Sequence, residues 1–350
     1  MINPDRTAFN IFGRDIYWYG VLMAVGIVVA VWLATCEGKR KRLYKDAVID
    51  LALVVIPCGI VGARVFYVLF NIEPYLANPI SVFYLWEGGL AIYGAIIGGM
   101  IGMFFFARRK NMRFFKLADC VIPGLVLAQA IGRWGNFFNQ EAYGLPVTAQ
   151  MLQQFPFLSM FPFSVKIDAP WLGGFHMFNG EQCLNPIHLA TFFYESAWCL
   201  LIFAFLWLRR KKFRHDGDPL FYYTLLYSFE RMFVEGLRAD SLWLIQPGKV
   251  AALVGGIRVS QLLSFLLFLG MGTFLLLRAI KEKQTGRLMW PAPEVLTDAE
   301  DAPEAEEADG DVPGSSDAPA EEEESGAEPE AEGDEPAEPE EDASEGGEEA

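Results

Sequence analysis

Residues 117–144 read LADCVIPGLVLAQAIGRWGNFFNQEAYG, an apolar run that ends in a polar segment. The part at 117–131 has the composition of a membrane-spanning helix, and Arg133 and Asn136 follow it directly. A charge on a spanning helix costs roughly 2.5–3.5 kcal/mol on insertion scales, so a buried arginine beside hydrogen-bonding amides indicates a functional site. The alternative is an arginine at a helix end whose side chain extends to the membrane surface.

The rest of the chain has the same apolar character. Hydrophobic residues make up 53% of the sequence, and several runs reach the roughly twenty residues needed to cross a bilayer. We therefore predict an all-α polytopic membrane protein with seven transmembrane helices, a small extracytoplasmic head between helices 4 and 5, and a disordered acidic C-terminal tail. The predicted spans are 16–35, 47–70, 88–107, 117–138, 187–208, 219–237 and 258–279.

Lysine and arginine orient the predicted bundle, because short basic loops stay in the cytoplasm. The connections at 36–46, 108–116 and 209–214 hold five basic residues each, whereas 139–186 holds only Lys166. This pattern predicts a multi-pass protein of the bacterial cell membrane with the N-terminus outside and the C-terminus in the cytoplasm. A basic stop-transfer cluster at 39–42 argues against a cleavable signal peptide.

The formal charge of −16 comes from the end of the chain. Residues 291–350 contain 26 Asp and Glu and no Lys or Arg, so residues 1–290 carry a net charge of +10. We predict a transmembrane body at 1–290, which includes the head at 139–186, and a disordered cytoplasmic tail at 291–350. No disulfide framework is expected, because of the five cysteines only Cys183 falls in a predicted outside loop.

Polar residues of several predicted spans lie at one depth. At 1.5 Å per residue, Arg64 is in the outer half of the second span, as are Tyr19 of the first and Tyr93 of the third. Arg133 and Asn136 end the fourth span, and Glu195 begins the fifth.

On the sixth span, four residues share one helical face by their spacing, namely Tyr227, Arg231, Glu235 and Arg238. Arginines outnumber the acids of this region, and the guanidinium fork matches phosphate oxygens, so we expect a phosphate-bearing ligand. An internal salt-bridge network that only holds helices together is the alternative, especially for Arg231 with Glu235.

Five motifs resemble one known family. GRWGNFFNQE at 132–141, with Gly144, closely resembles the signature of bacterial prolipoprotein diacylglyceryl transferases. WYG at 18–20, GAR at 62–64, EGGLAIYG at 87–94 and RMFVEGLR at 231–238 fit the same family in order and spacing. The resemblance runs from about residue 10 to residue 285 and excludes the acidic tail.

The resemblance implies an enzyme that moves the diacylglyceryl group of phosphatidylglycerol to the lipobox cysteine thiol of prolipoprotein signal peptides. Glycerol phosphate would be released, and the thioether formed would be the first step of lipoprotein maturation. By position, Arg133 and Arg231 match the essential arginines of the family, Asn136 and Gly144 match its polar loop, and Tyr19 matches its first-helix tyrosine.

Our expected site follows from both lines of argument. The candidate catalytic residues are Arg133, Arg231 and Tyr93. The candidate substrate-binding residues are Tyr19, Arg64, Asn136, Asn139, Glu141, Gly144, Tyr227, Glu235 and Arg238. No metal, cofactor or nucleic acid is expected, since no zinc-ligand spacing is present and the three histidines are scattered.

The sequence departs from the family pattern at two places. Many members have histidine where this chain has Tyr93, and a phenol of pKa near 10 is a poor base at neutral pH, so the general base stays open. The fifth-helix pattern usually opens with His-Pro before a Tyr-Glu pair; here the matching positions are Leu189 and Ala190, and His188 comes one residue early.

Two other classes of function are weighed against an enzyme. A transporter or channel for an anionic solute would also carry charges inside its spans, but it tends to have internal repeats and a midplane site, and neither is seen. A lipid-binding scaffold would show no turnover with any lipid.

Overall fold

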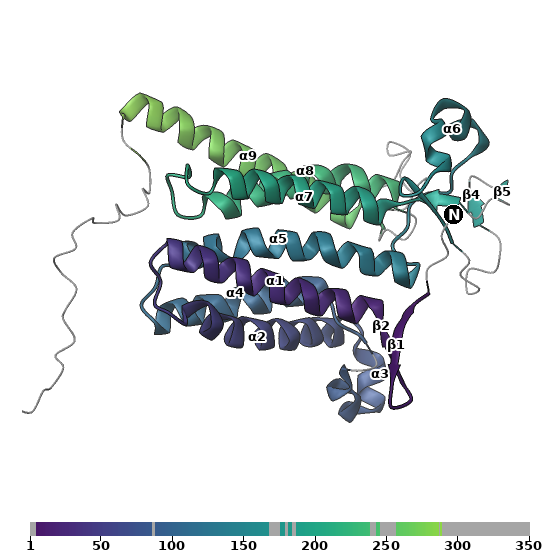
Figure 1. Ribbon diagram of the computed structural model, residues 1–350, viewed down its shortest axis with the longest axis horizontal. Coiled ribbons are helices and arrows are strands. Elements are labelled where there is room, and N and C mark those ends of the chain that lie inside the picture. Colours follow the sequence, from purple (N-terminus) through teal and green to yellow (C-terminus); the bar gives the residue numbers. More distant parts are fainter. Residues whose placement is uncertain are drawn as a thin grey trace, which may run out of the picture. The chain divides into compact units, whose positions relative to one another are not determined.

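The computed structural model describes residues 5–85, 88–167, 176–178, 181–183, 187–238, 243–245, 257–286 and 288. The part of the chain up to residue 295 forms one compact unit, and its architecture is mostly helical (Figure 1). Six helices in the described residues are long and apolar enough to cross a membrane: α1 (Trp18–Arg40), α2 (Ala47–Phe70), α4 (Ile92–Arg109), α5 (Phe114–Asn139), α7 (Thr191–Arg209) and α9 (Val259–Thr285). The prediction of a polytopic α-helical membrane protein is confirmed.

A seventh long helix, α8 (Asp218–Leu237), covers the predicted sixth span. It packs against both α7 and α9. It is not among the six because Glu230, Arg231 and Glu235 lower its apolar character. The number of seven spans stays a prediction. Helix α8 carries three buried acids, namely Asp218, Glu230 and Glu235.

Helix α5 occupies the centre of the packing, with α1 along one side and α7 and α8 along the other (Figure 1). Small residues let α1 come close: Gly124 of α5 faces Ala30, and Gly26 of α1 faces Ala128. On the other side, Val126 and Cys199 belong to a buried cluster that α5 shares with α7. This packing fixes the end of α5, where the polar segment begins, against the ends of its neighbours.

Glycines also explain why α2 and α4 form a close pair. A Cβ at Gly98 would collide with the backbone of Cys58, and one at Gly62 would collide with the backbone of Gly98. A Cβ at Gly102 would meet Cβ of Cys58 at 2.9 Å, whereas one at Gly99 would make an ordinary contact of 3.6 Å with Val55. Close approach of small residues is a common basis of helix association in membranes.

Short elements lie at the outer ends of these helices by the predicted orientation. They are β1 (Thr7–Ile11) and β2 (Arg14–Tyr17), which form a hairpin, α3 (Ile72–Ala77), η1 (Pro79–Phe83), α6 (Ala149–Gln154), η3 (Pro156–Ser159), β3 (Ser164–Lys166), β4 (His176–Phe178), β5 (Glu181–Cys183), β6 (Ile187–Leu189), β7 (Trp243–Ile245) and β8 (Ile257–Arg258). Strand β3 pairs antiparallel with β6, β4 with β5, and β7 with β8.

Five of these elements, α6 to β5, fall within the predicted head at 139–186. The assignment of this region as an extracytoplasmic head stays a prediction. The predicted tail at 291–350 lies outside the described residues.

Candidate functional site

Three arginines converge on the carboxylate of Glu195 at the start of α7. The Nη2 atom of Arg133 lies 2.5 Å from Glu195 Oε2, and Nη1 of Arg231 lies 3.0 Å from the same oxygen. Arg238 approaches the other oxygen, with 3.6 Å between Nη1 and Oε1. Glu195 is 1% exposed, so one buried carboxylate neutralises part of a concentrated positive charge. We call Arg133, Glu195, Arg231, Glu235 and Arg238 the arginine cluster.

The expected face of α8 is present. Arg231 uses its second nitrogen, Nη2, to pair with Glu235 Oε2 at 2.7 Å, one helical turn further along. Tyr227, one turn earlier, accepts a long hydrogen bond of 3.5 Å from Arg133 Nη2. The ion pairs expected of a network that holds helices together therefore exist: among the described residues, three arginines pair with the carboxylates of Glu195 and Glu235.

Hydrogen bonds between α5 and α7 set the distance between Arg133 and Glu195. Trp134 donates from Nε1 to Ser196 Oγ at 3.1 Å, and Ser196 donates to the Ala130 carbonyl at 2.9 Å. Each of these residues neighbours the cluster in sequence or lies one turn away. The Arg133–Glu195 pair thus rests on a packed helix contact.

The chain after α5 turns back onto the end of α8. Gly144 donates its backbone N–H to the Leu189 carbonyl at 2.8 Å, and Leu145 donates to the Leu237 carbonyl at 2.7 Å. Gly144 thereby bridges to Arg238 in an antiparallel contact. A Cβ at Gly144 would come within 2.7 Å of the Leu189 Cβ, so only glycine permits this approach.

A second polar group lies at the end of α5. The side-chain amides of Asn136 and Asn139 both donate to Glu141 Oε1, at 3.1 and 3.3 Å. The carbonyl oxygen of Asn139, Oδ1, is buried and has no hydrogen-bond partner in the described part of the chain. Tyr19 of α1 packs directly on Gly135, within electrostatic range of Glu141 and Arg133.

Arg64 and Tyr93 lie apart from these groups, on the α2–α4 pair. All five N–H donors of Arg64 bind main-chain carbonyls, at distances from 2.7 to 3.3 Å. The acceptors are the carbonyls of Ser81, Val82, Tyr84, Gly88 and Gly89. Tyr93 is 40% exposed, and its ring lies 6.4 Å from that of Phe66.

No hydrogen bond or ion pair among the described residues joins Arg64 or Tyr93 to the arginine cluster. A substrate-binding role for Arg64 stays a prediction, and in this structure its side chain has no N–H left to donate.

Most of the chain matches the model of a known protein family. The model described as prolipoprotein diacylglyceryl transferase matches residues 6–277, which is more than half of the chain. The chain belongs to the prolipoprotein diacylglyceryl transferase family.

Relatives in the family agree with this assignment. A phosphatidylglycerol–prolipoprotein diacylglyceryl transferase of Enterococcus faecalis is 41% identical over 266 residues, covering 75% of this chain and 87% of the relative. Proteins of the same name from Clostridioides difficile and Oceanobacillus iheyensis are 40% identical over 253 residues and 38% identical over 276 residues. The alignment with the Clostridioides difficile protein covers 72% of this chain and 91% of the relative. The alignment with the Oceanobacillus iheyensis protein covers 78% of this chain and 88% of the relative.

Two acids of this transferase-family site were absent from the residues chosen from the sequence. The sequence places Glu195, which holds the cluster together, at the depth of the predicted site as the only acid of the predicted fifth span, but it was not chosen as a candidate residue. Glu230 directly precedes Arg231 and is 6% exposed, but its position relative to the α8 face gave no signal of its burial. His188 is 1% exposed in β6, with its ring 4.8 Å from that of Tyr143, and it lies outside the arginine cluster.

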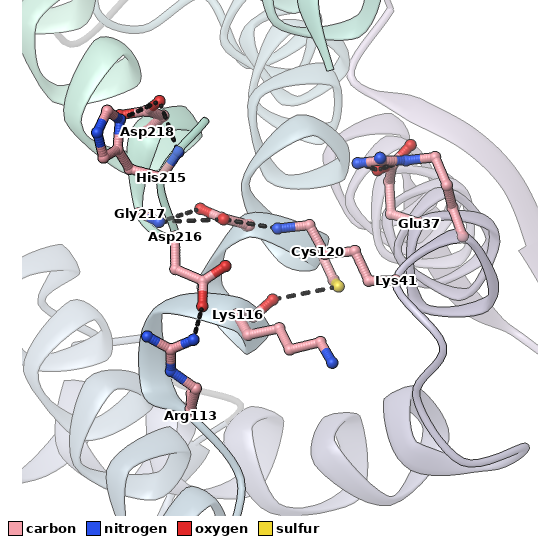
Figure 2. Close-up of polar contacts among 11 residues, drawn as sticks. Glu37, Lys41, Arg113, Lys116, Cys120, His215, Asp216, Gly217 and Asp218 are labelled. Carbon is pink, nitrogen blue, oxygen red and sulfur yellow. Dashed lines mark hydrogen bonds and ion pairs between the residues drawn. The ribbon is translucent and has the colours of Figure 1, made fainter. Parts of the chain in front are cut away.

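A separate polar network lies at the helix ends opposite to the arginine cluster. Figure 2 shows part of this network. Lys41 pairs with Asp119 at 2.6 Å, and Gly217 donates its backbone N–H to both Asp119 oxygens at 3.0 Å. His215 presents Nδ1 to Asp218 at 3.3 Å and Nε2 to Glu282 at 2.8 Å. These contacts join α1, α5, α8 and α9, and they hold the basic ends of the helices together.

Proposed function

We propose that this protein transfers the diacylglyceryl group of phosphatidylglycerol to the lipobox cysteine thiol of prolipoproteins, forming a thioether and releasing glycerol phosphate. The observation that carries the proposal is the convergence of Arg133, Arg231 and Arg238 on one buried carboxylate in a chain of this family. The relatives' names specify the same lipid and the same acceptor class.

The reaction is an alkyl transfer. The thiol gives up its proton, the sulfur attacks the glyceryl carbon bonded to a phosphate oxygen, and that carbon–oxygen bond breaks. The bonding electrons leave with the phosphate oxygen, so negative charge grows on the departing glycerol phosphate. Arg133 and Arg231 are suited to stabilise this charge, because donors held in place in a dry cavity act more strongly than in water.

Glu195 acts in this proposal as the resident anion of the site. Its oxygens lie between the guanidinium groups, where phosphate oxygens of the substrate would bind. A carboxylate is planar and a phosphate is tetrahedral, but both present anionic oxygens that accept hydrogen bonds from arginine. Phosphate binding would draw Arg133 and Arg231 partly away from Glu195. Glu235 would keep Arg231 oriented through the exchange.

The polar segment after α5 is proposed to bind the rest of the headgroup. The buried Asn139 Oδ1 can accept a hydrogen bond from a glycerol hydroxyl, and Asn136 and Glu141 hold that amide in place. Tyr19 lies beside this group on Gly135. Gly144 shapes the return of the loop, and Tyr227 supports Arg133. Tyr93 is assigned a hydroxyl contact with thiol or lipid.

The proposal places the site on the outer side of the cell membrane. Support comes from the basic residues at 39–42, 108–113 and 209–214, which lie at the helix ends opposite to the arginine cluster. Exported precursors present their lipobox cysteine on that side.

The test is mass spectrometry of a lipobox peptide after incubation with the purified protein and phosphatidylglycerol. We expect a diacylglyceryl thioether on the peptide cysteine, and no product from a peptide with serine at that position. Arg133→Ala and Arg231→Ala should abolish the product while protein levels stay near normal, and lysine at either position should not restore it fully.

Full activity in either alanine variant would remove that arginine from the mechanism. Absence of the thioether with the unmodified protein would contradict the proposed function and leave a transporter or a scaffold.

A further inference from the structure

Gln129 is a polar side chain within the apolar part of α5. It lies four residues before Arg133, in a stretch at 126–131 whose other members are all apolar. Helix α5 is long and apolar enough to cross a membrane, and Gln129 is only partly buried within the protein. A polar group at such a position in a spanning helix is costly, so it indicates a partner or a function.

One side of the Gln129 amide has a partner in the protein. The hydroxyl of Tyr223 in α8 donates to Gln129 Oε1 at 3.0 Å. The amide nitrogen Nε2 carries two N–H donors, and neither has an acceptor among the described residues. Leaving an amide donor without an acceptor in an apolar environment is unfavourable. A hydrogen bond that only joins α5 to α8 would explain Oε1, but it leaves the two N–H groups unexplained.

A row of contacts connects Gln129 to the arginine cluster. The ring of Tyr223 stacks on that of Tyr227, with 5.6 Å between the ring centroids. Tyr227 in turn accepts the hydrogen bond from Arg133 Nη2. Gln129 and Arg133 are one helical turn apart, or about 6 Å along the axis at 1.5 Å per residue. The row therefore begins and ends on α5 and passes through two tyrosines of α8.

Gln129 also shares a face of α5 with the proposed lipid site. By helical spacing this face includes Gln129, Gly132 and Asn136, and all three are only partly buried. Asn136 belongs to the group that is proposed to bind the headgroup, at the end of α5. Gln129 lies on the same side of the helix, further from that end and toward the apolar middle.

The free donors of Gln129 fit an ester carbonyl. In a glycerophospholipid, one glyceryl carbon is bonded to the phosphate oxygen and the other two carry the acyl esters. If the phosphate binds at Arg133, the esters lie a few bonds further toward the acyl chains, which is the direction in which Gln129 lies. An ester carbonyl accepts hydrogen bonds and donates none, so it complements the two N–H groups of Nε2.

We propose that Gln129 donates a hydrogen bond to an acyl ester carbonyl of the lipid substrate and thereby selects lipids with ester-linked chains. Tyr223 orients the amide by binding its oxygen, so that the N–H groups face the lipid. Gln129 contacts the lipid away from the bond that breaks, and it is a specificity-determining residue. The inference rests on the proposed function, because it concerns the lipid substrate of the same site.

The experiment compares two phosphatidylglycerols of equal chain length, one with ester-linked and one with ether-linked chains. The ether lipid lacks both carbonyl oxygens, while its headgroup and the carbon–oxygen bond that breaks are the same. We measure kcat/KM for each lipid with the purified full chain in a neutral detergent, by mass spectrometry of the lipobox peptide. We expect the unmodified protein to favour the ester lipid about tenfold, as for the loss of one buried hydrogen bond.

Variants of the amide make the result specific. Gln129→Leu and Gln129→Met remove the N–H donors, so both should use the two lipids about equally, through a loss of about tenfold with the ester lipid. Tyr223→Phe deletes the bond between α5 and α8 but keeps the donors, so it should retain the preference for the ester lipid. Gln261→Leu is the matched control, because Gln261 of α9 already donates from Nε2 to the Met232 carbonyl at 2.9 Å. It should also keep the preference.

Equal kcat/KM for the two lipids with the unmodified protein would overturn the inference, as would an undiminished ester preference in the Gln129 variants. Loss of the preference in Tyr223→Phe to the same extent would show that only the bond between helices matters. Unfolding of both Gln129 variants, seen by thermal denaturation, would likewise assign the amide to the structure and contradict the proposal.

Two other outcomes are distinct from these. A rise in KM for the lipobox peptide alone, with the lipid preference unchanged, would assign the amide to the acceptor and overturn the inference. Failure of the unmodified protein to form a thioether from either lipid would instead count against the proposed function.

Discussion

At the scale of single residues, similar side chains in this protein have different tasks because their surroundings differ. Arg64 is buried and Arg231 is partly buried, both in long helices, yet Arg64 hydrogen-bonds only to backbone carbonyls and Arg231 pairs with two carboxylates. A guanidinium held by carboxylates can exchange one of them for phosphate oxygens, whereas one held by five carbonyls would have to break a loop. The hydrogen-bond acceptors of Arg64 and Arg231 therefore distinguish the roles of these two arginines more clearly than their predicted depth in the membrane does.

Tyr93 gives a residue-scale prediction. Tyr93 is 40% exposed at the start of α4, and Tyr93→Phe deletes only the hydroxyl. If the hydroxyl contacts the thiol or the lipid headgroup, we expect transfer to fall at least about tenfold, or about 1.4 kcal/mol. Tyr93→His should retain more activity than Tyr93→Phe. Rates equal to those of the unmodified protein across neutral and alkaline pH would mean that the hydroxyl has no role.

At the scale of elements, the long helices could be predicted from the sequence, whereas their contacts could be predicted only in part. The predicted span 47–70 coincides with α2, and 219–237 falls within α8, because apolar length and helical spacing are local properties of the chain. The convergence of Arg133 with Arg231 was also accessible, since both lie near the ends of predicted spans. The partners of Arg64 were not, because they depend on how the segment at 81–89 folds back onto α2.

The α2–α4 contact gives an element-scale prediction with an internal control. Gly98→Ala places a Cβ against the Cys58 backbone, and separating the helices should cost about 1–3 kcal/mol, as for other overpacked sites. Gly99→Ala meets only Val55 at 3.6 Å, and the gain in helix propensity should leave stability equal or slightly higher. Thermal unfolding in detergent measures both. A Gly98→Ala midpoint equal to that of Gly99→Ala would show that close approach there is dispensable.

At the scale of the whole molecule, charge is sorted along the chain. Residues 1–290 carry +10 and residues 291–350 hold 26 acids, so the two parts differ in sign as well as in apolar content. Within the membrane body, the network around Asp119 and the arginine cluster lie at opposite ends of α5. The orientation of the molecule in the membrane depends on which of the two networks faces the cytoplasm, and the basic loops predict that it is the network around Asp119.

Cysteine labelling tests this orientation. Cys36 is exposed near the end of α1 that leads into the basic cluster at 39–42, and Cys183 lies in β5, within the predicted head. A membrane-impermeant maleimide added to intact cells should label Cys183 and not Cys36, and permeabilised cells should show label on Cys36 as well. Single-cysteine variants report each position separately. The reverse pattern would invert the topology and move the proposed site to the cytoplasmic side.

The five carbonyl contacts of Arg64 also bear on how this family can diverge. The hydrogen bonds of Arg64 go to main-chain oxygens and do not depend on the side chains of the residues that supply them, so we expect residues 81–85 to vary during evolution while the loop keeps its path. The exceptions are Gly88 and Gly89, whose positive φ angles of 85° and 71° few other residues adopt, and at Gly89 a Cβ would lie 2.5 Å from Arg64 Nη1. We therefore expect residues 81–85 to vary among relatives and Gly88, Gly89 and Arg64 to vary little. A relative that lacks one of these three residues should lack the others as well.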